Sequence, residues 1–277
     1  MTLVSGAGST KSQPSQFSSN EIRWRLVNEP ELHEKPVHLP ALGLIELAME
    51  VAMSSEIRCF FDGTSAGIYT TRVPFSGVAN PSELGSMERR VQAAAALLPN
   101  ESWMSVIAYG CTSGSAVIGH KRLVELIREV RPGLPIVTPI SAVSAAIRSL
   151  GAEKIAAVTP YTMEVNRIIE GTLAEDGVEI ISACTFGIED GFTMMQMPPE
   201  CFLEAALSAD VPEAEAIFIS CTGIFVSDVL EKIEAATGKP VVTSNQAIAW
   251  QCLEMAGVQA PSLKYGKLFG CRQRQDT

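Results

Sequence analysis

Short apolar runs alternate with amphipathic stretches along this chain from Ala41 onward. Each run is short enough for a buried strand, and β-branched residues are common in them. Parallel strands need long crossover connections, so strands that alternate with helices predict a parallel α/β sheet. The predicted strands cover residues 41–47, 66–73, 103–109, 135–138, 154–159, 178–183, 215–220 and 240–243.

The stretches between these runs carry apolar residues at helical spacing. Leu123, Leu126, Ile127 and Val130 follow the i, i+3, i+4, i+7 pattern, and the same spacing begins again at Val226 with Val229, Leu230 and Ile233. Both sets predict helices that bury one face against the sheet.

The two halves of the chain follow the same order of motifs. Each has an apolar strand, a Cys-Thr pair, a helix, a second short strand ("PIVT" or "PVVT") and a further helix. This repetition predicts a duplicated α/β unit. It implies two pseudo-symmetric lobes, each a four-stranded parallel sheet flanked by helices. We expect a polar arm at 1–38, a first lobe at 39–150 and a second at 151–277, with room for the chain to cross back at its end.

Composition narrows the function classes. The chain has 277 residues and a net charge of -10, which disfavours nucleic acid and anionic membrane surfaces as partners. The first residues are rich in Ser, Gly and Gln without an apolar signal segment, and no run is long enough to span a membrane. The seven cysteines form no zinc-ligand pattern. We therefore expect a cytoplasmic protein with reduced thiols and no metal.

Two cysteines occupy equivalent places in the two halves. Cys111 lies in "AYGCTSGSAVIG" and Cys221 in "FISCTGIFVSD", each where an apolar strand ends and a helix is expected to begin. A helix N-terminus lowers the pKa of a thiol. The backbone N–H groups that follow each cysteine can hold a carboxylate. These N–H groups belong to Thr112, Ser113, Gly114, Thr222 and Gly223.

Ligands of open parallel sheets lie beyond the carboxyl ends of the strands, so two lobes that face each other would bring both thiols to one cleft. Thiols on opposite sides of a carbon can remove a proton from one face and return it on the other, without a cofactor. The competing interpretation is a structural cysteine copied by the duplication.

Several motifs resemble a known family. The segments "YGCTSGSAVIG", "VTPYTMEVN", "SCTG", "KPVVTSNQAIAWQCLEMAG" and "TRVPFSGVANPSEL" resemble the maleate isomerase branch of the Asp/Glu racemase superfamily, which includes arylmalonate decarboxylases. Within that branch the resemblance is closest to ectoine-utilisation proteins, and it extends from about residue 40 to 258. It implies two Rossmann-like lobes with the active site between them. It also implies that Cys111 adds to the substrate as a thiolate, that Cys221 donates and accepts a proton, and that Tyr161 binds substrate.

Two positions differ from the family pattern. Glu50 stands where maleate isomerases carry an Asn that contacts a substrate carboxylate, and "EDG" (189–191) stands near a second family Asn. A carboxylate facing a carboxylate is repulsive unless one is protonated, so Glu50 would suit an ammonium, amidinium or hydroxyl group. The alternative for Glu50 is a solvated residue at a helix start. Asn245 is expected to be the N-cap of the last helix.

Three functions stay open from the sequence. The first is a cofactor-independent isomerase or racemase acting on a small carboxylic or amino acid, in ectoine or hydroxyectoine catabolism or similar to maleate isomerase. The second is a decarboxylase that uses Cys221 alone, and the presence of Cys111 argues against it. The third is a two-lobed binding protein without turnover. Family habit and helix faces of small residues favour a homodimer or a higher homo-oligomer.

Overall fold

All strands in the described part of the chain lie in two parallel sheets of the same order. The computed structural model describes residues 40–259 and 265–271. The first sheet has the order β2-β1-β3-β4 and the second the order β6-β5-β7-β8. Their bounds are β1 Ala41–Leu47, β2 Gly67–Val73, β3 Val106–Gly110, β4 Ile136–Val137, β5 Lys154–Thr159, β6 Glu179–Thr185, β7 Ala216–Ile219 and β8 Val241–Thr243. Every predicted strand is present, and the predicted fold class is confirmed.

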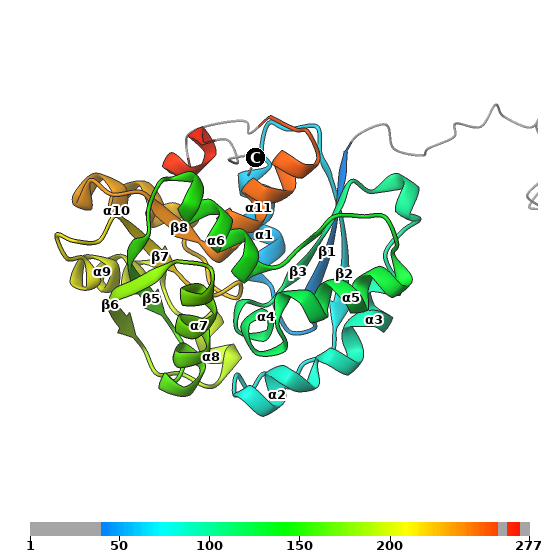
Figure 1. Ribbon diagram of the computed structural model, residues 1–277, viewed down its shortest axis with the longest axis horizontal. Helices are drawn as coiled ribbons and strands as arrows, with labels where there is room; N and C mark the ends of the chain where they lie inside the picture. Colours follow the sequence, from blue (N-terminus) through cyan, green and yellow to red (C-terminus); the bar gives the residue numbers. More distant parts are fainter. Residues whose placement is uncertain (1–39, 260–264, 272–277) are drawn as a thin grey trace, which may run out of the picture. The chain divides into compact units, whose positions relative to one another are not determined.

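Helices flank both sheets (Figure 1). In the first half, α3 packs on β2 and α5, while α1 packs on β1; in the second, α9 packs on β5 and β6, while α7 packs on β6. The α-helices are α1 Ala52–Phe60, α2 Pro81–Ser86, α3 Glu88–Ala96, α4 Thr112–Ile118, α5 His120–Val130, α6 Pro139–Ser149, α7 Met163–Glu175, α8 Gly191–Met195, α9 Pro199–Ala209, α10 Leu230–Thr237 and α11 Ser244–Met255. Short 3-10 helices cover Glu101–Trp103 (η1), Ser227–Val229 (η2) and Lys267–Gly270 (η4).

The two predicted amphipathic stretches bury most of the expected side chains. Leu123, Leu126 and Ile127 are buried on α5, whereas Val130 at its end is only partly buried. The second set is buried from the N-cap of η2 through α10. The second set begins in the 3-10 turn Ser227–Val229, which directly precedes the first regular turn of α10.

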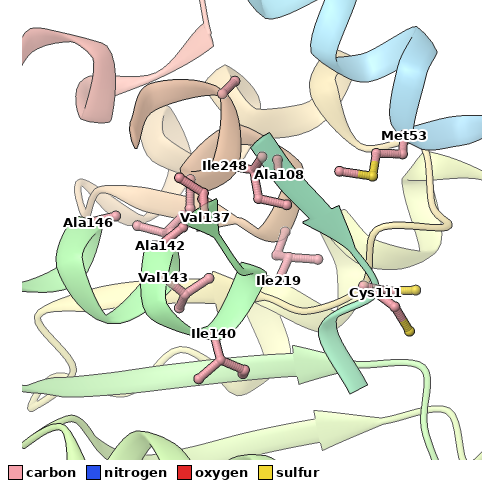
Figure 2. Packing of buried hydrophobic residues seen from close by; sticks show 14 of the residues in the cluster. Met53, Ala108, Cys111, Val137, Ile140, Ala142, Val143, Ala146, Ile219 and Ile248 are labelled. Atoms are coloured by element: carbon pink, nitrogen blue, oxygen red, sulfur yellow. The ribbon is translucent and has the colours of Figure 1, made fainter. Parts of the chain in front are cut away.

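The last helix of each half packs on the other half. Helix α11 follows the second sheet but packs against α1 and β3, and α6 follows the first sheet but contacts β8 and α7. The two helices also pack on each other. Figure 2 shows Ile140, Ala142, Val143 and Ala146 of α6 among side chains of both sheets, in one continuous buried cluster. The lobe limits 39–150 and 151–277 stay predictions.

The predicted arm, residues 1–38, lies outside the described residues. No helix within the described ranges is both long and apolar enough to cross a bilayer.

Candidate active site

A small cavity lies at the carboxyl ends of strands from both sheets. Its volume is about 40 Å³. By the same measure of volume, a cavity needs roughly 10–15 Å³ to hold one water molecule, so this cavity suits a small ligand. All the predicted site residues line it together: Glu50, Cys111, Thr112, Ser113, Tyr161, Cys221, Thr222 and Gly223. Side chains from both halves of the chain therefore share one cavity, as the duplication predicts.

Cys111 follows β3 and is the N-cap residue of α4. Its backbone is extended, with φ -153° and ψ 111°, and its Sγ accepts a hydrogen bond from the N–H of Gly114 at 3.3 Å. Ser113 Oγ lies 3.7 Å from the same sulfur. A Cβ at Gly114 would lie 3.0 Å from that Sγ and 2.7 Å from Met87 Cε, so glycine is needed there for close packing.

Cys221 has a different backbone. Its φ is +139°, a value that residues with a side chain rarely adopt, and the residues after it form bends rather than a helix. The N–H of Gly223 donates to Cys221 Sγ at 3.3 Å. The prediction that both cysteines open a helix is therefore correct for Cys111 and wrong for Cys221, because the next helical residues begin only at Ser227.

Two residues of α11 hold the Cys221 turn in place. Ser244 Oγ accepts the N–H of Cys221 at 3.1 Å, and Asn245 Nδ2 donates to the carbonyl oxygen of Thr222 at 3.0 Å. The N-cap of α11 is Thr243 and not Asn245, as its capping box with Gln246 shows. Sequence analysis missed this supporting role, since a polar pair at a helix start has the same pattern as an ordinary cap.

A direct hydrogen bond joins the two cysteine turns. Thr222 Oγ1 lies 3.3 Å from the carbonyl oxygen of Gly110, the residue before Cys111, and 3.5 Å from Glu50 Oε2. Its single proton can serve one of these acceptors at a time. The thiols also interact electrostatically, since a charge on Cys111 raises the pKa of Cys221.

Burial controls the protonation of both thiols. It raises the pKa of Cys111 to about 12, against a smaller lowering by the Gly114 N–H and the Ser113 hydroxyl. It likewise raises the pKa of Cys221 to about 12, against a smaller lowering by a hydrogen bond from Tyr161. The expectation of lowered thiol pKa values is therefore wrong for the unliganded cavity, because the cost of a buried charge exceeds the gain from backbone donors.

Tyr161 is buried beside Cys221. Burial raises the pKa of its phenol well above the ordinary value, and the neighbouring thiol raises it further. The phenol therefore keeps its proton and donates a hydrogen bond to the sulfur of Cys221. Asn166 Nδ2 and Thr185 Oγ1 both donate to the Tyr161 carbonyl oxygen, at 3.2 Å and 2.5 Å, and fix the backbone at this point.

Glu50 lies between β1 and α1 and is only 2% exposed, so it is not a solvated residue. Burial raises the pKa of its carboxyl to about 8, and the neighbouring Glu46 adds to the shift. The Met53 N–H and the Thr222 hydroxyl favour the ionised form to a lesser extent. Glu50 Oε1 is buried and has no hydrogen-bond partner among the described residues.

The rest of the lining is mostly apolar and was not predicted. It comes from Leu47, Met49, Phe75, Ala79, Leu84, Gly191, Met194 and Met195. Of the "EDG" segment only Gly191 reaches the cavity. Glu189 accepts a hydrogen bond from Asn80 at 2.8 Å, and Asp190 caps α8 through the N–H of Thr193 at 2.9 Å. No sequence signal distinguishes these lining side chains from ordinary core residues.

Two sheets of identical strand order, each with a buried thiol after its third strand, define a two-lobed α/β protein with a paired-cysteine cavity. The chain belongs to the arylmalonate decarboxylase family, whose family model matches residues 78–269. The arylmalonate decarboxylase of Bordetella bronchiseptica is 30% identical over 140 residues, which cover 50% of this chain and 58% of that protein.

Maleate isomerases are also similar to this chain. The maleate isomerase of Alcaligenes faecalis is 21% identical over 232 residues, covering 79% of this chain and 91% of that protein. The solved structure of a maleate cis-trans isomerase from Nocardia farcinica, a mutant with a covalently bound succinylcysteine intermediate, matches with a TM-score of 0.75 at 22% identity. That match covers 86% of this chain and 100% of the other, and shows the shared fold.

Proposed function

We propose that this chain is a cofactor-independent isomerase or racemase that acts on a small carboxylic or amino acid through Cys111 and Cys221. One observation carries the proposal: thiols that follow equivalent strands of two sheets line a single small cavity. A structural cysteine copied by duplication has no reason to retain a place on a cavity wall in both copies.

For racemisation, one sulfur is a thiolate and the other a thiol. The thiolate takes the proton from the carbon beside the substrate carboxylate, and the electron pair of that bond moves into the carboxylate as an enolate. The opposite thiol then gives its proton to the other face of the carbon. The first sulfur ends as a thiol and the second as a thiolate, so the two sulfurs have exchanged protonation states and no redox change occurs.

For cis–trans isomerisation, the Cys111 thiolate bonds to one alkene carbon, and Cys221 protonates the neighbouring carbon. The new carbon–carbon single bond rotates. Cys221 then takes a proton back, the double bond forms again and the carbon–sulfur bond breaks to return the thiolate. The succinylcysteine intermediate of the Nocardia farcinica protein is the product expected of the first step in that protein.

The backbone donors of the two turns suit the substrate carboxylate. The N–H groups of Thr112 and Ser113 lie at the start of α4, and those of Thr222 and Gly223 follow Cys221. Donors fixed around a developing enolate stabilise it without reorganisation. We assign these four residues, Glu50 and Tyr161 to substrate binding.

Decarboxylation with Cys221 alone is the second candidate. In that reaction carbon dioxide leaves, the electron pair stays as an enolate and Cys221 protonates it, after which the thiolate regains a proton from solvent. The apolar lining and the 30% identity to an arylmalonate decarboxylase favour it. Cys111, buried on the same wall, has no role in this reaction, and we therefore rank it second.

For the metabolic setting we propose ectoine or hydroxyectoine catabolism, on the basis of the motif resemblance alone. The cytoplasmic location and the homo-oligomeric state stay predictions from the sequence. A thermal-shift screen with ectoine-derived amino acids, hydroxyectoine, maleate and substituted malonates selects ligands, because a ligand that binds the folded state raises its melting temperature.

The test of the reaction is solvent deuterium wash-in to the selected ligand. Loss of exchange in both Cys111→Ser and Cys221→Ser supports the two-thiol proposal. Loss in Cys221→Ser only, with carbon dioxide release by the native chain, supports the decarboxylase. Binding without any exchange overturns both. Cys252→Ala is the matched control, since Cys252 is a buried thiol on α11 that does not line the cavity, and exchange should persist there.

A further inference from the structure

The cavity wall contains a carboxyl group with one oxygen that lacks a hydrogen-bond partner. Glu50 is buried, it lines the cavity, and its Oε1 has no hydrogen-bond partner among the described residues. Its Oε2 lies 3.5 Å from Thr222 Oγ1, whose proton Gly110 O also accepts, and the Met53 N–H favours the ionised carboxyl to a smaller extent than burial opposes it. A buried polar atom without a partner is costly, which is a reason to expect a ligand group there.

The charge of Arg72 lowers the pKa of Glu50 only as the smallest of the contributions, because the guanidinium binds other groups. The guanidinium of Arg72 donates through Nη1 to the carbonyl oxygens of Leu47 at 3.0 Å and Glu50 at 2.6 Å, and its Nη2 lies 3.2 Å from Glu46 Oε2. Arg72 therefore binds the main chain around Glu50 and a different carboxylate. Glu46, by contrast, adds a negative charge close to Glu50.

The described residues that line the cavity include no Lys, Arg or His. The proposed chemistry places a thiolate, a substrate carboxylate and an enolate among them. Cys111, Cys221 and Tyr109 each have a pKa raised in part by the charge of Glu50. These groups, with Glu46 and Arg72, are the titratable and charged groups that face Glu50. A cavity with several potential anions and no cation needs a positive charge from outside.

We infer that the ligand itself supplies this charge: the substrate is a monocarboxylate that carries an ammonium or amidinium group, and Glu50 binds that group through Oε1. The inference rests on the proposed function and narrows its substrate class. The carboxylate of such a ligand is held by the backbone donors of the two turns, and its cation by Glu50. A dicarboxylate would instead place a second carboxylate against Glu50, which could accommodate it only while Glu50 keeps its proton, so the ionised site discriminates against it.

The bound cation also changes the protonation of Glu50 and the charge that acts on the two thiols. At pH 7 the Glu50 carboxyl, with its pKa of about 8, holds a proton in the unliganded cavity. A cation at hydrogen-bond distance favours the ionised carboxylate, so binding at pH 7 should release this proton. The bound cation offsets the negative charge that Glu50 gains, which alone would raise the pKa values of Cys111 and Cys221 further.

The test compares ligands of equal shape that differ in one charge. We would measure binding of alanine against isobutyrate, and of proline against cyclopentanecarboxylate, by calorimetry with the full chain, using racemic amino acids. The ammonium member of each pair should bind at least about tenfold more tightly, as for a hydrogen bond to a charged group. Repeating the titration in two buffers of different ionisation enthalpy reports the proton released at pH 7.

The variant Glu50→Gln should remove both the preference and the proton release. Glu56→Gln is the matched control, because Glu56 is equally buried but binds Ser227 Oγ at 2.7 Å and does not line the cavity. Equal binding within the pairs on the native chain overturns the inference, as does tighter binding of maleate. A preference that survives in Glu50→Gln also overturns it.

These outcomes are separate from those of the exchange test. If deuterium exchange depends on both cysteines but no charge preference exists, the substrate class is wrong and the two-thiol reaction stands. If the preference depends on Glu50 but no exchange occurs, the binding site stands and the reaction fails.

Discussion

The turns at Cys111 and Cys221 occupy equivalent places in the two halves but are built differently. The Cys111 turn is an extended N-cap followed at once by a helix, and it is held by local contacts with Gly114 and Ser113. The Cys221 turn has a positive φ, no helix directly after it, and support from Ser244 and Asn245 of a distant helix.

The difference shows that the local backbone does not decide the state of these thiols. Both have a pKa raised to about 12, although only one of them is a helix N-cap. Burial dominates in each case. A cavity that keeps both sulfurs neutral can begin the reaction from either side, once a ligand changes the balance.

Glu50 faces both turns, and its removal should give the largest change in stability. In the folded chain Glu50 has a pKa of about 8 and keeps its proton below that pH, whereas in the unfolded chain it loses the proton near pH 4.5. The free energy of unfolding should therefore fall as pH rises between these values, by about 1 kcal/mol per pH unit from this group. In Glu50→Gln this contribution is absent.

Urea denaturation of both proteins from pH 5 to 9 measures that contribution as the difference between two curves. Glu56 also has a raised pKa but remains in both proteins, so its contribution cancels. Glu46 remains as well, but its charge interacts with Glu50, so the difference between the curves includes this coupling. Parallel curves would show that Glu50 ionises normally in the folded chain, and would remove its link to both thiols.

Gly114→Ala should damage the Cys111 turn alone. The added Cβ would lie 2.7 Å from Met87 Cε, 2.9 Å from the Tyr109 hydroxyl and 3.0 Å from Cys111 Sγ. Overpacking of this kind costs about 1–3 kcal/mol of stability and should move the sulfur. Thermal or urea unfolding gives the cost, and deuterium exchange gives the loss of activity.

Gly171→Ala on α7 is the control, because a Cβ there meets nothing within 4 Å. It should be neutral or stabilising by up to about 1 kcal/mol, as expected of a helix interior. Similar losses in both variants would mean that the close packing at Gly114 has no special effect.

Asn245→Ala should damage the Cys221 turn alone. It leaves the buried Thr222 carbonyl without the 3.0 Å hydrogen bond from Asn245 Nδ2. The expected cost is about 1–2 kcal/mol in the free energy of unfolding, measured in urea. Gln92→Ala removes an exposed hydrogen bond to Glu129 instead and should cost far less. Equal costs would argue that α11 does not support this turn.

Cys221→Gly and Cys221→Ala test the strain at the positive φ. Glycine adopts φ near +139° freely and alanine does not, so the glycine variant should be more stable by about 1 kcal/mol. Both variants lose the thiol, which makes unfolding in urea the relevant measurement. No difference between them would show that the turn relaxes when the sulfur is removed.

The sequence predicted the fold and the polar part of the cavity well, for identifiable reasons. Apolar runs such as 41–47 and 154–159 form largely buried strands because each lies in the interior of its sheet, between two neighbouring strands. Cys111 and Cys221 were found because the duplication marks them twice. Glu50 and Tyr161 were found through the family resemblance.

What sequence could not predict depends on packing between distant segments. Asn245 has the pattern of a cap, and only the approach of α11 to the Cys221 turn gives it a different partner. Met194 and Phe75 have the same pattern as core residues, although they line the cavity. The thiol pKa values follow from burial, which no local motif reports.

The reciprocal packing of α6 and α11 also bears on how the chain can be divided. A cut near Gly151 would give two fragments, each carrying a last helix that also packs on the other half. Each fragment would expose part of its apolar surface when expressed alone. When the two fragments are expressed together, their exposed apolar faces are complementary. Protein engineering should therefore treat the two fragments as a pair.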